Sequence, residues 1–154
     1  VEDVAGREGE VAEWIALVQP TSPFLLPEHI DACVDVLAAD PEAGSVQTVI
    51  PCPHNQHAFN QRVVEDGRVA FRFPEERAEA YNKQRKPPLW LFGNLIVFHA
   101  ERALAQGTLF AEPSRTVEVP QLFGFDCDGP LDFLVGDALL AARLVELPHL
   151  PAPD

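Results

Sequence analysis

The order of apolar and polar residues along this chain predicts strands that alternate with helices. Residues 14–19 form an apolar run that ends in a polar, proline-bracketed turn, and such runs are typical of strands buried on both faces. Apolar residues at spacings of three and four then predict a helix over 27–39, with Pro27 in its first turn. Strands alternating with helices imply a layered α/β fold.

The later elements continue this alternation. The Asp-Gly pair within 63–73 predicts a hairpin, and the charged, proline-rich segment 74–88 predicts an exposed loop. We expect the pair Gly93-Asn94 to interrupt the strand in which it lies. The remaining expectations are strands at 45–50, 89–99 and 116–119 and helices at 100–106 and 131–147.

These elements predict one α/β domain over residues 1–147, with 1–13 as a short helix or lead-in and 148–154 as a frayed tail. A sheet built only from the predicted strands is small. One of its edges would lie open where further strands should pair. The pattern therefore predicts a segment that is missing from this sequence or supplied by another chain.

Composition narrows the function classes. The chain has 154 residues, 47% of them hydrophobic, and a formal net charge of −13. Such acidity disfavours nucleic acid and anionic membrane surfaces as partners. No apolar run approaches the length of a membrane span, and the acidic N-terminus is unlike a signal peptide, so we expect a cytoplasmic protein.

The sharpest candidate site is Asp126-Cys127-Asp128, followed by Asp132. Side chains two apart on an extended segment face the same way, so the two carboxylates at 126 and 128 suit one hard cation. Mg²⁺ binds one or two carboxylates together with substrate phosphates. Taken by spacing alone, the same residues fit the alternative of helix capping by Asp128, with a favourable charge at Asp132 in the first turn.

Two further polar segments are candidates for substrate contacts. Gln19, Thr21 and Ser22 lie at a strand end, where ligands bind in open α/β sheets, although a hydroxyl there also suits a turn. Segment 83–86 holds the only concentrated basic patch, which is suited to a carboxylate or phosphate or simply to solvent.

The remaining motifs point away from metal-histidine and thiol chemistry. His54 and His57 have metal-pair spacing but no third ligand nearby, so we interpret them as part of a polar loop. Cys33, Cys52 and Cys127 are odd in number and share no CxxC spacing, which argues against a disulfide framework or structural zinc.

Four stretches, in the same order, resemble the CMP-sialic acid synthetases (acylneuraminate cytidylyltransferases). They are LVQPTSPF at 17–24, SVQTVIPCPHN at 45–55, NKQRKPPLWLFGNLIVF at 82–98 and FDCDGPLDFLVGDALL at 125–140. The resemblance implies a Rossmann-like, GT-A-like nucleotidyltransferase fold, a three-layer α/β/α arrangement with a mostly parallel sheet. The resemblance implies that this sequence lacks the N-terminal CTP-binding portion of the family's fold.

The implied reaction transfers CMP from CTP to the anomeric hydroxyl of a 2-keto sugar acid and releases pyrophosphate. By position, Asp126 and Asp128 would be the catalytic residues that hold Mg²⁺. Together with the polar strand end, the resemblance gives the expected substrate-binding set as Gln19, Thr21, Ser22, Lys83, Gln84 and Asn94.

The sequence also departs from the family. The expected Asn-Gly order is reversed in Gly93-Asn94, and Val97 stands in place of a Tyr, which leaves open a substrate other than sialic acid. The family's loop for the CTP phosphates has no counterpart here. These departures leave open a non-catalytic binding module or half of a split enzyme, which would need a companion N-terminal half. Family members often pair through the segment equivalent to 59–88, which makes a homodimer a further expectation.

Overall fold

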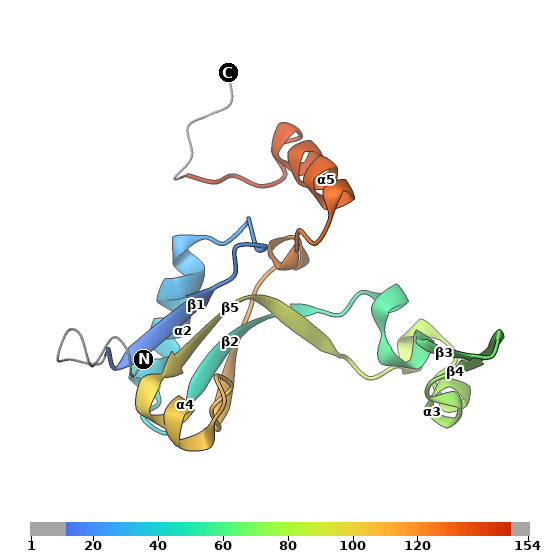
Figure 1. Ribbon diagram of the computed structural model, residues 1–154, viewed down its shortest axis with the longest axis horizontal. Helices are drawn as coiled ribbons and strands as arrows, with labels where there is room; N and C mark the ends of the chain where they lie inside the picture. Colours follow the sequence, from blue (N-terminus) through green and yellow to red (C-terminus); the bar gives the residue numbers. More distant parts are fainter. Residues whose placement is uncertain (1–11, 149–154) are drawn as a thin grey trace. The chain divides into compact units, whose positions relative to one another are not determined.

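The computed structural model describes residues 12–148, which divide into two compact units (Figure 1). Unit 1 takes in the chain up to Ile50 and from Phe92 onward, and unit 2 comprises Pro51–Leu91. The expectations for residues 1–11 and for the tail over 149–154 lie outside the described residues. No helix in the described part of the chain is long and apolar enough to cross a membrane.

Unit 1 is built on a four-stranded mixed sheet with the strand order β1-β5-β2-β6. β1 runs antiparallel to β5, with Trp14 opposite His99, whereas β2 and β6 are parallel. The expectation of a mostly parallel sheet is therefore not confirmed, because an apolar run does not record the direction in which its strand runs. The strand bounds are β1 Trp14–Val18, β2 Ser45–Pro51, β5 Trp90–His99 and β6 Ser114–Glu118.

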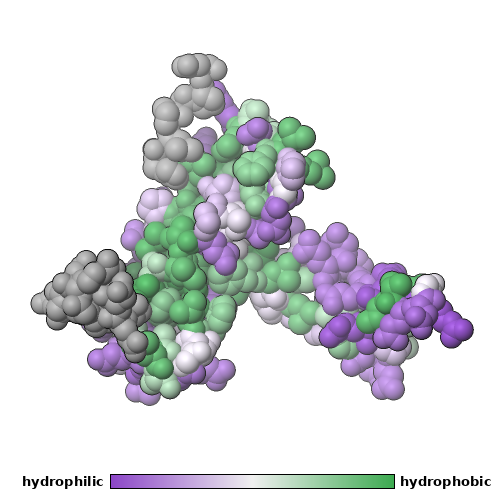
Figure 2. All heavy atoms as spheres, viewed as in Figure 1, coloured by the Kyte–Doolittle hydropathy of each residue, from purple (hydrophilic) through white to green (hydrophobic). Residues whose placement is uncertain are grey.

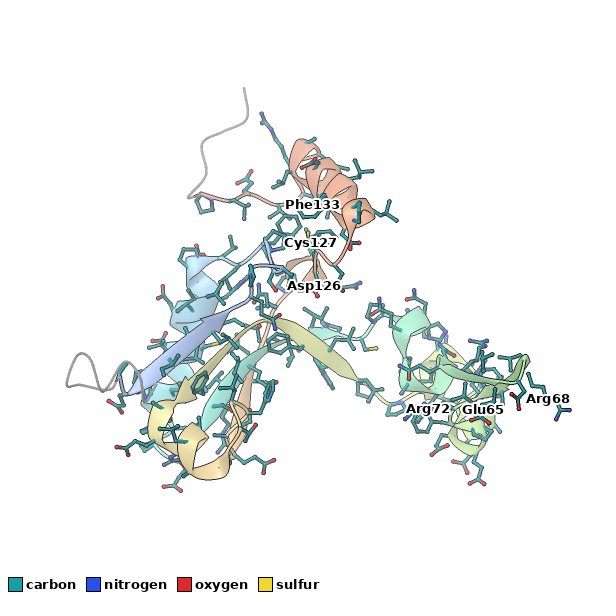
Figure 3. The ribbon with its side chains drawn as sticks, in the orientation of Figure 1. Glu65, Arg68, Arg72, Asp126, Cys127 and Phe133 are labelled. Atoms are coloured by element: carbon teal, nitrogen blue, oxygen red, sulfur yellow. The ribbon has the colours of Figure 1, made fainter. Side chains whose placement is uncertain are left out.

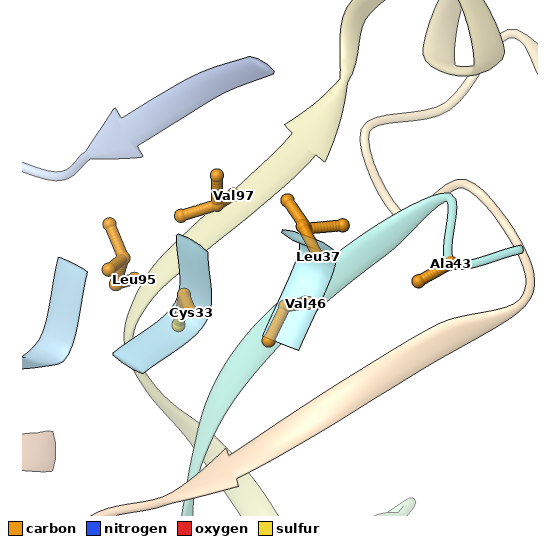
Figure 4. Close-up of a cluster of buried hydrophobic side chains, with 6 residues drawn as sticks. All are labelled: Cys33, Leu37, Ala43, Val46, Leu95 and Val97. Atoms are coloured by element: carbon orange, nitrogen blue, oxygen red, sulfur yellow. The ribbon is translucent and has the colours of Figure 1, made fainter. Parts of the chain in front are cut away.

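Helices cover both faces of this sheet. Alternate residues of β5 point to opposite sides: Leu95 and Val97 join a core with α2, while Ile96 and Phe98 join a second core with α4 (Figure 4 shows the first core). The predicted helices 27–39 and 100–106 are confirmed, whereas the last helix is shorter than expected. The helices are α2 Pro27–Ala39, α4 Ala100–Gln106 and α5 Pro130–Ala141.

The terminal helix α5 leaves most of its apolar side chains in solvent. Leu131 and Leu134 are 70% and 67% exposed, and Gly136 is its one buried residue, lying against the Phe125 ring. Figure 2 shows apolar residues gathered over this helix. A helix with so many apolar side chains is normally covered by other parts of a protein.

β5 is continuous through Gly93-Asn94, so the expected interruption is wrong. A side chain at Gly93 would approach the Thr48 hydroxyl oxygen to 2.6 Å, which shows that the glycine permits close strand contact. The buried Thr48 hydroxyl accepts the backbone N–H groups of Asn94 and Leu95, each over 2.9 Å. It also donates to the Asn94 side-chain carbonyl oxygen over 3.0 Å. Thr48 therefore adds side-chain hydrogen bonds between β2 and β5.

The Asn94 amide extends this network to α2. Its Nδ2 atom lies 3.1 Å from Nδ1 of His29, and the Leu26 N–H donates to the same nitrogen over 3.3 Å. Because a backbone N–H can only donate, Nδ1 must be unprotonated and the neutral ring carries its proton on Nε2. Burial lowers the pKa of His29, an effect that the Glu28 carboxylate partly opposes.

Unit 2 contains the predicted hairpin, which turns at Asp66 and Gly67 with φ values of 50° and 73°. The expectation of an irregular loop over 74–88 is wrong in part, because Pro74 starts a short helix there. The elements are β3 Arg62–Glu65, β4 Arg68–Phe71, α3 Pro74–Glu79 and the 3₁₀ turns η1 His54–Gln56, η2 Ala58–Asn60 and η3 Lys83–Arg85.

Replacing Thr48 with Val should destabilise the protein by about 2–4 kcal/mol, because two backbone N–H groups and the Asn94 carbonyl oxygen lose their partner in the core. Urea unfolding of the variant checks this. Thr48→Ser keeps the hydroxyl and should lose much less. Equal losses in the two variants would contradict the role of the hydroxyl.

Acidification should destabilise the wild type through His29. The pKa of His29 is lowered in the folded state, so the unfolded chain takes up its proton first as the pH falls through about 6.5. The free energy of unfolding should therefore fall between about pH 7.5 and 5.5. His29→Asn should show a smaller fall over the same range, and equal slopes would contradict the prediction.

Candidate functional site

The carboxyl end of β1 leads into a tight polar turn. The Ser22 N–H donates to the Gln19 carbonyl oxygen over 3.1 Å, and this bond closes the turn. The Gln19 side chain is exposed, Thr21 is half-buried and Ser22 is buried. Of the three predicted contact residues, Gln19 thus offers the most accessible polar group.

The Asp126-Cys127-Asp128 segment is held beside this turn. The Cys127 N–H donates to the Thr21 carbonyl oxygen over 2.8 Å, and the Phe24 and Phe125 rings stack with their centroids 5.2 Å apart. Figure 3 shows Asp126 and Cys127 where the chain enters α5. The structure therefore brings together the strand end and the acidic motif, which lie far apart in the sequence.

Helix capping in this region is performed by Asp132. One of its carboxylate oxygens accepts the backbone N–H groups of Asp128 and Gly129 over 3.0 Å and 2.9 Å. The alternative in which Asp128 caps the helix is therefore wrong. Asp126 and Asp128 are exposed, and neither carboxylate accepts a hydrogen bond from the described residues. Both remain available to an external cation.

The acidic segment carries a negative electrostatic potential, which affects the pKa of the Cys127 thiol within it. Partial burial and, after it, the carboxylates of Asp132, Asp126 and Asp128 raise the pKa of the Cys127 thiol. A thiol held protonated is a poor nucleophile, in line with the sequence interpretation. The same potential favours a cation at the surface of this segment.

The two carboxylates suit a Mg²⁺ ion only if other ligands complete its coordination. Among residues 12–148, no group of three or more His, Cys, Asp or Glu side chains is arranged to hold a metal. Two exposed carboxylates agree with the usual Mg²⁺ pattern, in which substrate phosphates and waters complete the coordination. Metal binding here would depend on a phosphorylated ligand.

Asn94 does not face solvent. Its side chain is fully buried at 0% exposure between Thr48 and His29. Its expected contact with substrate stays a prediction, although the structure assigns the amide a clear role in joining β5 to α2. The polar network of Thr48, Asn94 and His29 was not anticipated from the sequence, since a buried Thr in an apolar run gives no signal.

The predicted basic segment belongs to unit 2. Lys83 and Gln84 are exposed on the turn η3, which the Asn82 side chain caps by accepting the Arg85 N–H over 3.1 Å. Burial, followed by the charges of Lys86 and Lys83, lowers the pKa of His54. This surface of unit 2 therefore has a positive potential, which suits an anionic ligand group.

The histidine pair of unit 2 is part of a folded loop, as interpreted from the sequence. Nδ1 of His57 accepts the Phe59 N–H over 3.1 Å, which leaves Nε2 to donate to the Pro87 carbonyl oxygen over 3.0 Å. Both ring nitrogens of His57 are engaged within the unit, so neither is free to ligate a metal.

Comparison with known proteins identifies a fold. No protein-family model matches the chain, and no curated protein matches it. Among solved structures, the chain is similar to CMP:2-keto-3-deoxy-manno-octonic acid synthetase complexed with CTP, with a TM-score of 0.61 and 14% sequence identity. The match covers 91% of this chain and 66% of the synthetase chain. The chain thus has the α/β fold of that synthetase and spans about two-thirds of its length.

Binding of Mg²⁺ at Asp126 and Asp128 should accelerate alkylation of Cys127. Neutralising the two carboxylates lowers the thiol pKa and so increases the fraction of reactive thiolate. The rate with iodoacetamide at about pH 8, read by mass spectrometry with and without Mg²⁺ and CMP, checks this.

Cys52 is the internal control, because burial alone raises its pKa and no carboxylate contributes. Its alkylation rate should not respond to Mg²⁺. In the Asp126→Asn and Asp128→Asn variants the response of Cys127 should disappear. An unchanged Cys127 rate in the wild type would contradict a cation site on this segment.

Proposed function

We propose that this chain forms the sugar-acid side of a Mg²⁺-dependent cytidylyltransferase that transfers CMP from CTP to a 2-keto sugar acid and releases pyrophosphate. The observation that carries the proposal is the hydrogen bond between Cys127 and Thr21, which holds an acidic, metal-competent segment beside the polar end of β1. Strand ends of this kind are where ligands bind in open α/β sheets. The fold similarity to a synthetase solved with CTP agrees with this function.

In the proposed reaction, the anomeric hydroxyl oxygen forms a bond to the α-phosphorus of CTP, the bond from that phosphorus to the pyrophosphate oxygen breaks, and the hydroxyl proton is released to solvent. Asp126 and Asp128 would hold Mg²⁺, which would neutralise phosphate charge. The Gln19 amide and the Thr21 hydroxyl orient the sugar acid through its hydroxyl groups. Each of these roles relies on positioning more than on proton transfer.

Lys83 and Gln84 are proposed to bind an anionic ligand group at the surface of unit 2. Their support is the positive potential of the unit 2 surface, which the lowered pKa of His54 reports. Ser22 and Asn94, both buried, are proposed to shape the site and not to reach the reacting atoms. A cytoplasmic location and a homodimer remain predictions from the sequence.

Removing either carboxylate of the acidic segment should abolish most activity. Loss of a metal ligand costs several kcal/mol of charge stabilisation, so Asp126→Asn and Asp128→Asn should each lower kcat by about 100-fold or more. The assay is pyrophosphate release with Mg²⁺, CTP and a panel of 2-keto sugar acids. It is run on the chain alone and on the chain co-expressed with the part of the synthetase that it does not span.

Asp137→Asn is the matched control, because it removes the same charge from an exposed position on α5. It should leave turnover within about two-fold of the wild type. Full activity in both segment variants would contradict the proposed roles. Absence of pyrophosphate from every mixture, with the chain folded, would favour the non-catalytic module instead.

A further inference from the structure

His29 is buried, at 7% exposure, where α2 begins. Leu26, the N-cap residue of this helix, has no polar side chain that could bond to the first turn. His29 completes the cap instead. Its backbone N–H donates to the Leu26 carbonyl oxygen over 3.1 Å, and its Nδ1 atom accepts the Leu26 N–H over 3.3 Å. This is the reciprocal arrangement of a capping box, with an imidazole in place of the usual Glu or Gln.

The same ring contacts two other segments of unit 1. Its Nδ1 atom lies 3.1 Å from the Nδ2 atom of Asn94 in β5. The ring also meets the Phe123 ring edge to face, with the centroids 4.8 Å apart and the planes at 75°. Phe123 belongs to the 3₁₀ turn η4 Gln121–Gly124, which comes shortly before Asp126. One side chain thus connects α2, β5 and the turn that leads to the acidic segment.

The chain between β6 and α5 is attached to the rest of unit 1 by successive contacts. Before η4, the Val119 N–H donates to the Val49 carbonyl oxygen over 2.9 Å. After η4, the Cys127 N–H donates to the Thr21 carbonyl oxygen over 2.8 Å. The contact of Phe123 with His29 lies between these two hydrogen bonds. A movement of the His29 ring would therefore act on the acidic segment from its N-terminal side.

The contacts of His29 require a neutral ring. Nε2 already carries the ring proton, so a second proton binds to Nδ1 and turns an acceptor into a donor. That donor would face the Leu26 N–H and the Asn94 amide N–H, and both hydrogen bonds would be lost. Protonation also places a charge in a buried position. The charged ring is therefore more stable nearer to solvent, away from Phe123.

Few titratable groups influence this ring in the described part of the chain. Burial lowers the pKa of His29, and the Glu28 carboxylate of the same helix partly opposes this effect. β5 and η4 meet the ring with Asn94 and Phe123, neither of which titrates. The folded protein therefore holds the ring neutral near pH 7 and takes up the proton only as the pH falls below about 6.5.

We propose that neutral His29 is a positioning residue for the acidic segment: through Phe123 it holds Asp126 and Asp128 beside the end of β1, and its protonation releases them. The ring acts through η4 on the two carboxylates. The effect on turnover rests on the proposed function, whereas the coupling between the ring and the segment does not.

Amide hydrogen exchange tests the coupling on the whole chain, without metal or nucleotide. The quantity measured is the protection factor of the Cys127 amide divided by that of the Ala100 amide. Ala100 donates to the Glu13 carbonyl oxygen over 2.9 Å and serves as the reference for unit 1. The ratio should fall by about five-fold or more between about pH 7.5 and 5.5. A general loss of stability lowers both protection factors and leaves their ratio unchanged.

His29→Asn keeps an acceptor for the Leu26 N–H but cannot take up the proton, so its ratio should be the same at both pH values. His54→Asn is the matched control, because it replaces a histidine of unit 2 whose pKa is also lowered. It should show the wild-type fall. A constant ratio in the wild type, or a fall that persists in His29→Asn, would overturn the proposal.

A second measurement needs no variant and applies if His29→Asn fails to fold. In the wild type, the ring-proton resonances of His29 and the protection ratio of Cys127 should change with the same midpoint pH. Different midpoints would overturn the proposal.

The exchange experiment separates this inference from the proposed function. A pH-dependent ratio in a chain that releases no pyrophosphate from any mixture would support the positioning role and overturn the function. Pyrophosphate release by a chain with a constant ratio would support the function and overturn the positioning role.

Discussion

The hydrogen bond from the Cys127 N–H to the Thr21 carbonyl oxygen is the interaction on which the candidate site depends. It joins a strand near the start of the chain to the segment before the last helix, and the stacked rings of Phe24 and Phe125 support it from the side. Without this connection, the two exposed carboxylates would be ordinary acidic surface. With it, they stand beside the polar end of a strand.

The three aspartates of this segment have separate roles. Asp132 accepts the backbone N–H groups that begin α5, so Asp126 and Asp128 do not have to cap the helix. The like charges of the three carboxylates repel one another, and after burial these charges also raise the pKa of Cys127. A bound cation would relieve this repulsion, which is why the segment suits a metal better than a free carboxylate or phosphate group.

Much of the local structure could be predicted from the sequence. The helix over 27–39 follows from its apolar spacing, and the hairpin follows from Asp66-Gly67, because both signals are local. Strand direction could not be predicted, since β5 is apolar on both faces whichever way it runs. The role of Gly93 was misread for a related reason: it accommodates Thr48 across the sheet, and no local pattern records that neighbour.

The candidate site shows the same limit. The spacing of Asp126 and Asp128 indicated a cation site, but the residue that frees them, Asp132, and the carbonyl that anchors them are known only from tertiary contacts. The sequence predicted a helix within 131–147 but not that its apolar side chains would be exposed. Whether the apolar side chains of a helix are covered depends on other segments, which the residue pattern of the helix does not record.

The most direct test of the central claim is Mn²⁺-induced line broadening in amide NMR spectra of the chain with CMP present. The account predicts that broadening concentrates on residues 125–129 and 19–22, since one cation at Asp126 and Asp128 lies near both segments. Broadening spread evenly over the acidic surface of unit 1, or its persistence at these residues in the Asp126→Asn, Asp128→Asn double variant, would contradict it.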